Sequence, residues 1–71
     1  MTIKELMESF NIQGAFHIKK WDNRVLDCVT AARGENFECY NWDIDEEAED
    51  ALNSKIAYMY VSDDVLIIEV K

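Results

Sequence analysis

The stretch IAYMYVSDDVLIIEV, at residues 56–70, decides the fold class of this 71-residue chain. Two runs rich in β-branched and aromatic residues, 56–61 and 65–70, lie on either side of the polar pair Asp63-Asp64, which is the pattern of a β-hairpin with a tight turn. Apolar residues alternate along both runs, so one face of the hairpin should belong to the core. The predicted core pairs are Ala57 with Val70, Met59 with Ile68, and Val61 with Leu66.

The other face of this hairpin is rich in tyrosine. Alternation places Tyr58 and Tyr60 opposite Glu69 and Ile67, which gives this second face more apolar surface than solvation alone explains. Contiguous exposed apolar surface of about a few hundred Å² marks interaction sites. We therefore expect this face to lie open and to be available to a protein partner or to a second copy of the chain.

The first ten residues predict an amphipathic helix over 2–10. Thr2 and Glu5 form a T-x-x-E capping box at its start. The apolar residues that follow have the i, i+3, i+4, i+7 spacing of one helical face: Ile3, Leu6, Met7 and Phe10. Such a helix needs a sheet or a second helix on which to bury this face.

A second hairpin is predicted from a strand over 15–21 and another from about 24 or 25 to 32. The turn signal Asp22-Asn23 lies between the two strands. A two-residue loop would set Ile18 opposite Asp27, whereas a three-residue loop over 22–24 sets Ile18 opposite Cys28. The three-residue loop also sets Phe16 opposite Thr30 and Lys19 opposite Asp27, so opposite charges face each other and we prefer this register.

The segment between the hairpins predicts a short, weakly patterned strand and a short helix. Residues 37–41 alternate weakly, and in a strand Phe37 and Cys39 would face the core beside Cys28. Asp43 or Asp45 then serves as the N-cap of a helix over about 45–53. Its narrow apolar stripe is Ala48, Ala51 and Leu52, and Asn53-Ser54 ends it.

These elements predict a single α+β domain over residues 1–71. We expect an antiparallel sheet of four or five strands, with the N-terminal helix packed on one face and the short second helix near residues 45–53. A chain of this length buries only about 60–65% of the surface that its unfolded form exposes. It therefore offers little room for a deep active-site cleft.

Charge is distributed unequally along the chain. Residues 1–35 hold five Lys/Arg and five Asp/Glu, whereas residues 36–71 hold two and ten, so the whole net charge of −8 belongs to the second half. An acidic surface repels phosphate groups, which disfavours nucleic acid and anionic membranes and favours a basic protein partner. No apolar run reaches the roughly 18 residues of a membrane span, and no signal-peptide pattern is found, so we expect a cytoplasmic protein.

The residues do not predict a metal site, a cofactor site or a catalytic site. A calcium loop starting at Asp43 would need Gly at its sixth position and Glu at its twelfth, where the chain has Ala48 and Ser54. The single histidine, His17, and Cys28 point to opposite faces in the preferred register, so no thiol–imidazole dyad is expected. We expect that the protein is not an enzyme and that it binds no cofactor.

The remaining signal is an acidic run beside exposed aromatic residues. Proteins that imitate duplex DNA place carboxylates where phosphates would lie and so bind the basic groove of a nuclease or repressor. The sharpest hypothesis is therefore an inhibitor of a basic, nucleic-acid-binding host protein. The alternative is a structural or accessory protein that forms a homodimer through the open sheet face, with acidity serving solubility only. The candidate partner-binding residues are Trp42, Asp43, Asp45, Glu46, Glu47, Glu49, Asp50, Tyr58 and Tyr60.

Several stretches of the chain also carry a family resemblance. They are residues 12–16 leading to Trp21-Asp22, Phe37-Glu38-Cys39 with Trp42, residues 56–60 and residues 68–70. Together they resemble short uncharacterised acidic proteins encoded on Firmicutes mobile elements, such as conjugative elements and prophages. The resemblance spans nearly the whole chain, transfers no functional residue, and implies a setting in which small acidic inhibitors of host defence are common. The segment over residues 46–54 is longer than in those proteins.

Overall fold

The computed structural model describes residues 1–10, 12–37 and 46–71, and for residues 46–48 it describes the backbone alone. The described residues form two helices and four strands. Their order is α1 (Ile3–Ser9), β1 (Ala15–Asp22), β2 (Asp27–Glu35), α2 (Glu46–Leu52), β3 (Ile56–Ser62) and β4 (Val65–Val70). The predicted α+β class, the N-terminal helix and the short second helix are confirmed. The predicted strand over 37–41 lies mostly outside the described residues.

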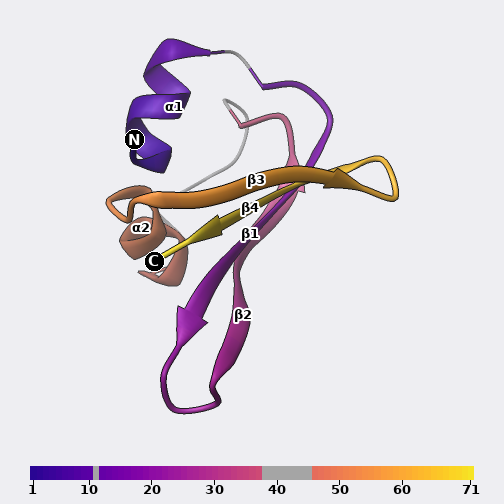
Figure 1. The fold of residues 1–71 in the computed structure, drawn as a ribbon. Coiled ribbons are helices and arrows are strands. Elements are labelled where there is room, and N and C mark those ends of the chain that lie inside the picture. The colour runs from indigo at the N-terminus through magenta and orange to yellow at the C-terminus, as the bar shows by residue number, and fades with distance from the viewer. Residues whose placement is uncertain (11, 38–45) are drawn as a thin grey trace.

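The sheet is mixed, which corrects the prediction of a purely antiparallel one. The strand order is β2-β1-β4-β3, with both hairpins antiparallel and the central pair β1 and β4 parallel (Figure 1). Strand β4, whose run of apolar residues is nearly continuous, lies in the centre of the sheet between β1 and β3. Sequence alternation within each hairpin does not report which strands of different hairpins become neighbours.

Helix α1 forms as its capping box predicts. The Thr2 side chain accepts a hydrogen bond from the Glu5 backbone N–H, and the Glu5 side chain accepts one from the Thr2 backbone N–H. Ile3 and Leu6 are buried, whereas Phe10 lies at the end of the helix and stays 62% exposed. No helix in the described ranges is both long enough and apolar enough to cross a membrane.

The core lies between the sheet and the two helices. The Phe16 and Phe37 rings meet edge to face, with centroids 4.6 Å apart and planes at 84°. Helix α2 contributes Ala51, which is completely buried. The other buried members of this core are Ile3, Leu6, Ile18, Ala31, Ala32, Ile68 and Val70.

Both registers considered for the first hairpin are wrong. Ile18 lies opposite Ala32, and a four-residue connection over 23–26 joins the strands. A register shift between Ile18 and Lys19 leaves Ala31 as an extra residue in β2. Ala31 and Ala32 are nearly inaccessible, and their small side chains let α2 lie close to β2. This long-range contact outweighs the local pairing of Lys19 with Asp27 on which the preferred register was based.

The connection over 23–26 contains a strained residue, which leads to a stability prediction. Leu26 has a φ of 53° and is 74% exposed, so its side chain contributes little packing while its backbone is left-handed. Leu26→Asn should raise the free energy of unfolding by about 0.5–1 kcal/mol, because Asn tolerates this conformation better. Urea unfolding checks it against Val25→Asn, an exposed neighbour without a positive φ, which should change stability by less than about 0.5 kcal/mol.

The second hairpin is largely confirmed. Met59 pairs with Ile68 and Val61 with Leu66 as predicted, but Ile56, and not Ala57, pairs with Val70 because a bulge lies between Ile56 and Tyr58. Two successive positive φ angles, 51° at Asp63 and 63° at Asp64, form the tight turn. This is the type I′ geometry that matches the twist of a two-residue hairpin.

Candidate functional site

The two faces of the sheet differ in what covers them. Helices α1 and α2 pack on the face that carries Ile18, Ile68 and Val70 (Figure 1). None of the described elements packs on the opposite face, which we call the open face. By alternation from the observed registers, its side chains are His17, Lys19, Trp21, Cys28, Thr30, Arg33, Tyr58, Tyr60, Val65, Ile67 and Glu69.

Aromatic side chains are the main exposed feature of the open face. Tyr58, Tyr60 and Trp21 are 68%, 44% and 48% exposed. A hollow of about 830 Å³ lies at one end of this face, and its lining includes Trp21, Tyr58, Cys28 and Glu69. Aromatic rings beside polar groups are typical of the residues that anchor protein–protein interfaces.

Glu69 is the centre of a small polar cluster on the open face. The Cys28 thiol donates a hydrogen bond to Glu69 Oε1 at 3.3 Å. The Tyr60 hydroxyl also hydrogen-bonds to Glu69, and this bond raises the Tyr60 pKa. The pKa of Cys28 is raised by burial first and then by the hydrogen bond to Glu69. A thiol held in its protonated form is a poor nucleophile, so this arrangement favours a structural role for Cys28.

His17 and Cys28 lie on the same face, so the prediction that they point to opposite faces is wrong. The prediction that Cys28 lies in the core beside Phe37 is also wrong. The four-residue connection shifts the pairing so that Cys28 lies opposite Trp21 and on the same face as His17. His17 Nε2 lies 2.8 Å from Thr30 Oγ1, while the Cys28 thiol bonds to Glu69. Each side chain has its own partner, and no hydrogen bond in the described residues joins the two.

The environment of His17 leads to a pH prediction. Burial, then the charges of Lys19 and Arg33, lower the pKa of His17 below its ordinary value of 6.5. The unfolded chain therefore takes up this proton first as the pH falls. The stabilising contribution of neutral His17 is complete above about pH 7.5 and is lost as the pH falls through 6.5 toward the lower folded pKa.

An NMR titration of the His17 ring protons checks this prediction, with a midpoint expected below 6.5. His17→Gln should remove the corresponding loss of stability between about pH 7.5 and 5.5. A midpoint above 6.5 would contradict the assignment, since it would mean that the folded state favours the charged ring.

The acidic segment lies only partly within the described residues. Trp42, Asp43 and Asp45 lie outside the described residues, and Glu46 and Glu47 are the first two residues of α2. Glu49 and Asp50 are exposed.

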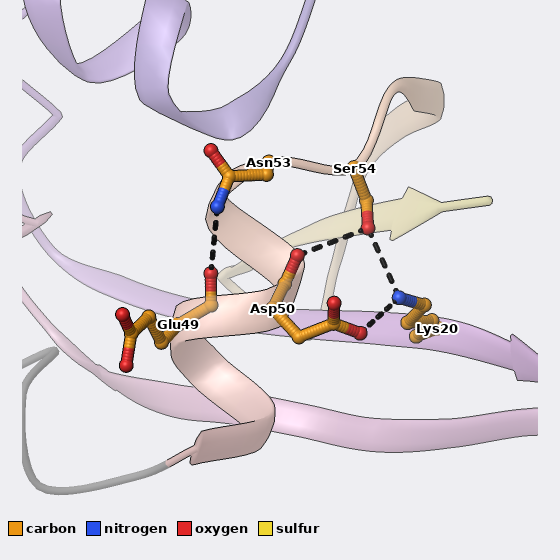
Figure 2. A network of polar contacts seen from close by, with 5 residues as sticks. All are labelled: Lys20, Glu49, Asp50, Asn53 and Ser54. Carbon is orange, nitrogen blue, oxygen red and sulfur yellow. Dashed lines mark hydrogen bonds and ion pairs between the residues drawn. The ribbon is translucent and has the colours of Figure 1, made fainter.

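Asp50 is not a free carboxylate. Figure 2 shows its carboxylate in an ion pair with the Lys20 ammonium group. Lys20 Nζ also donates to Ser54 Oγ at 3.1 Å, and the Ser54 hydroxyl donates to the Asp50 backbone carbonyl at 3.2 Å. This network fixes the C-terminal end of α2 against β1, so part of the acidic segment serves to dock the helix.

The structure separates the two groups of predicted binding residues. Helix α2 lies on the helix-bearing face, where Lys20 forms an ion pair with its Asp50, whereas Tyr58 and Tyr60 lie on the open face. The residues that sequence reasoning missed are Trp21 and Glu69. Alternation along β1 would have placed Trp21 on the open face with His17 and Lys19. The sequence did place Glu69 on the tyrosine-bearing face, but its contact with Cys28 depends on the parallel pairing of β1 and β4.

In the described part of the chain, no group of three or more His, Cys, Asp or Glu side chains is arranged to hold a metal ion. Comparisons with family models, with curated proteins and with solved structures give no match to this chain, so its resemblance to proteins of mobile elements stays a prediction.

Proposed function

We propose that this chain is a non-enzymatic protein-interaction module that binds a protein partner through its open face. The observation that carries the proposal is the one-sided packing of the sheet. Both helices cover one face, and the other presents Trp21, Tyr58 and Tyr60 with about half or more of each side chain accessible. A rigid sheet holds these rings in place, so binding would cost little conformational entropy.

The net charge of −8 determines the kind of partner that we propose. An acidic chain attracts a basic protein over long range and speeds their association, even where the acidic residues do not lie at the contact. Mimicry of duplex DNA, as a way to occupy the basic groove of a host protein, is the sharpest version of this function. The Lys20–Asp50 ion pair removes one carboxylate from such a row.

Affinity capture from a host lysate tests the proposal with the wild type and three variants of the chain. The open-face variant is Trp21→Ser with Tyr58→Ser, and the charge variant replaces Glu46, Glu47 and Glu49 by Gln. The control is Phe10→Ser, an exposed aromatic residue at the end of α1. We expect the wild type and the control to recover the same partner and the open-face variant to lose it.

The charge variant should retain the partner at low salt with slower association, because steering is electrostatic and is screened by salt. The proposal fails if all forms recover the same proteins or if none recovers any. Circular dichroism of each variant verifies that it is folded before the comparison is made.

A further inference from the structure

Strand β3 is an edge strand whose exposed residues are unusually apolar. It lies at the end of the strand order, beyond β4. Four consecutive residues, Tyr58, Met59, Tyr60 and Val61, are 68%, 49%, 44% and 71% exposed. Natural sheets protect such edges with charge, proline or bulges because an open edge pairs readily with another strand. The only such device in β3 is the bulge at its start, between Ile56 and Tyr58.

The hydrogen-bonding pattern shows which backbone groups of this edge are available. The two-residue turn is closed by the hydrogen-bonded pair Ser62 and Val65. Hydrogen-bonded and non-hydrogen-bonded pairs alternate from there along the hairpin, so the N–H and C=O groups of Tyr60 point toward β4. The groups of Met59 and Val61 therefore point outward. Ile56 also points outward, and its N–H already donates to the Met1 carbonyl at 2.8 Å. No described segment pairs with Met59 or Val61.

We propose that β3 pairs in antiparallel fashion with β3 of a second copy, around a two-fold axis at Tyr60. This axis sets Met59 opposite Val61 of the second copy and Val61 opposite its Met59. All the outward N–H and C=O groups of these two residues then form hydrogen bonds between the copies. The two Tyr60 rings become cross-strand neighbours on the open face, and the two sheets become one continuous sheet.

Charge complementarity favours a second copy as the occupant of this edge. Residues 56–62 carry no charge, so no carboxylates oppose each other although the chain is acidic overall. Lys55 precedes the strand and Asp63-Asp64 follow it, and all three are exposed. Antiparallel self-pairing brings Lys55 of each copy close to the acidic turn of the other, as a two-fold axis requires.

The proposal goes beyond the proposed function and can fail independently of it. Met59 and Val61 point toward the helix-bearing side of the sheet, whereas partner binding uses the open face. A dimer formed in this way leaves both open faces accessible and places them side by side on one continuous sheet. The paired strands alone bury less than the roughly 1,200 Å² of a standard interface, so we expect a weak dimer.

Sedimentation of the full chain up to about 1 mM tests the proposal with a matched pair of charge variants. The wild type should double its mass from 8.3 kDa as its concentration rises. Met59→Lys with Val61→Lys sets like charges opposite each other, and should raise the dissociation constant at least about tenfold. Met59→Lys with Val61→Glu sets opposite charges together, and should dimerise as the wild type does.

A disulfide experiment tests the register, in a background with Cys28→Ser and Cys39→Ser. Tyr60→Cys should form an intermolecular disulfide under mild oxidation, because directly opposed residues of a non-hydrogen-bonded pair lie about 4.5 Å apart at Cα. Tyr58→Cys should not, because its two copies would lie four residues out of register, about 13 Å apart.

A wild type that stays monomeric over this concentration range overturns the proposal. So does a like-charge variant that dimerises normally, or a disulfide that forms equally well at both positions. Loss of dimerisation in both charge variants overturns the axis at Tyr60.

Discussion

Phe16→Ala is expected to lower the free energy of unfolding by about 4 kcal/mol, because it removes a buried ring and leaves a cavity that the surrounding core cannot fill. Phe16 is only 2% exposed and meets Phe37 edge to face at 4.6 Å. A domain of this size has a total stability of about 4–10 kcal/mol. A large part of the chain should therefore unfold under mild conditions.

Urea unfolding followed by circular dichroism measures this effect. Phe10→Ala is the matched control, because it makes the same chemical change at a residue that is 62% exposed, and it should cost less than about 1 kcal/mol. Phe16→Leu keeps most of the buried volume and should cost about 1–1.5 kcal/mol. Equal losses for Phe10→Ala and Phe16→Ala would show that the ring pair does not belong to the core.

Ala51→Asp is expected to lower stability by about 3–5 kcal/mol at pH 7, since it buries a carboxylate without a partner. Ala51 has no exposed surface and packs in the core with Ile68 and Val70. Lys20 is already paired with Asp50, one residue away on the helix. The change should detach α2 from the sheet.

The pH dependence separates this charge effect from a steric one. Burial raises the pKa of the introduced carboxyl group, so the folded state binds its proton more readily than the unfolded state. The stability difference from the wild type should therefore shrink below about pH 5. Glu49→Asp, an exposed change in the same helix, should cost less than about 1 kcal/mol at either pH. A constant deficit across this range would count against burial of the charge.

Sequence patterns predicted the local elements well because those elements depend on neighbours. The capping box of Thr2 and Glu5 satisfies backbone donors within one turn, and it starts α1 where expected. The Asp63-Asp64 turn and the pairs of Met59 with Ile68 and Val61 with Leu66 follow from alternation across a short connection. Errors arose where the connection or a strand was longer than alternation assumes. The four-residue connection over 23–26 reversed the face of Cys28, and the extra residue at position 57 replaced the predicted partner of Val70.

The candidate site was predicted only in part, for a related reason. Tyr58 and Tyr60 were placed correctly on a face apart from the core, since both lie in a regular hairpin. The sequence could not show that these tyrosines and the acidic helix lie on different faces of the sheet, because this depends on where α2 docks. Lys20, thirty residues before Asp50, fixes that position, and the docked helix lies across the sheet from the tyrosines.

By itself, the sequence determined the capped N-terminal helix, the two hairpins, the acidic second half and the tyrosine-bearing strand. Each of these follows from interactions within a few residues or across one turn. Only the tertiary structure decided that β1 and β4 pair in parallel, that both helices cover one face, and that β3 becomes an apolar edge. These features depend on contacts between residues far apart in the chain, whose combined burial selects one arrangement of the elements.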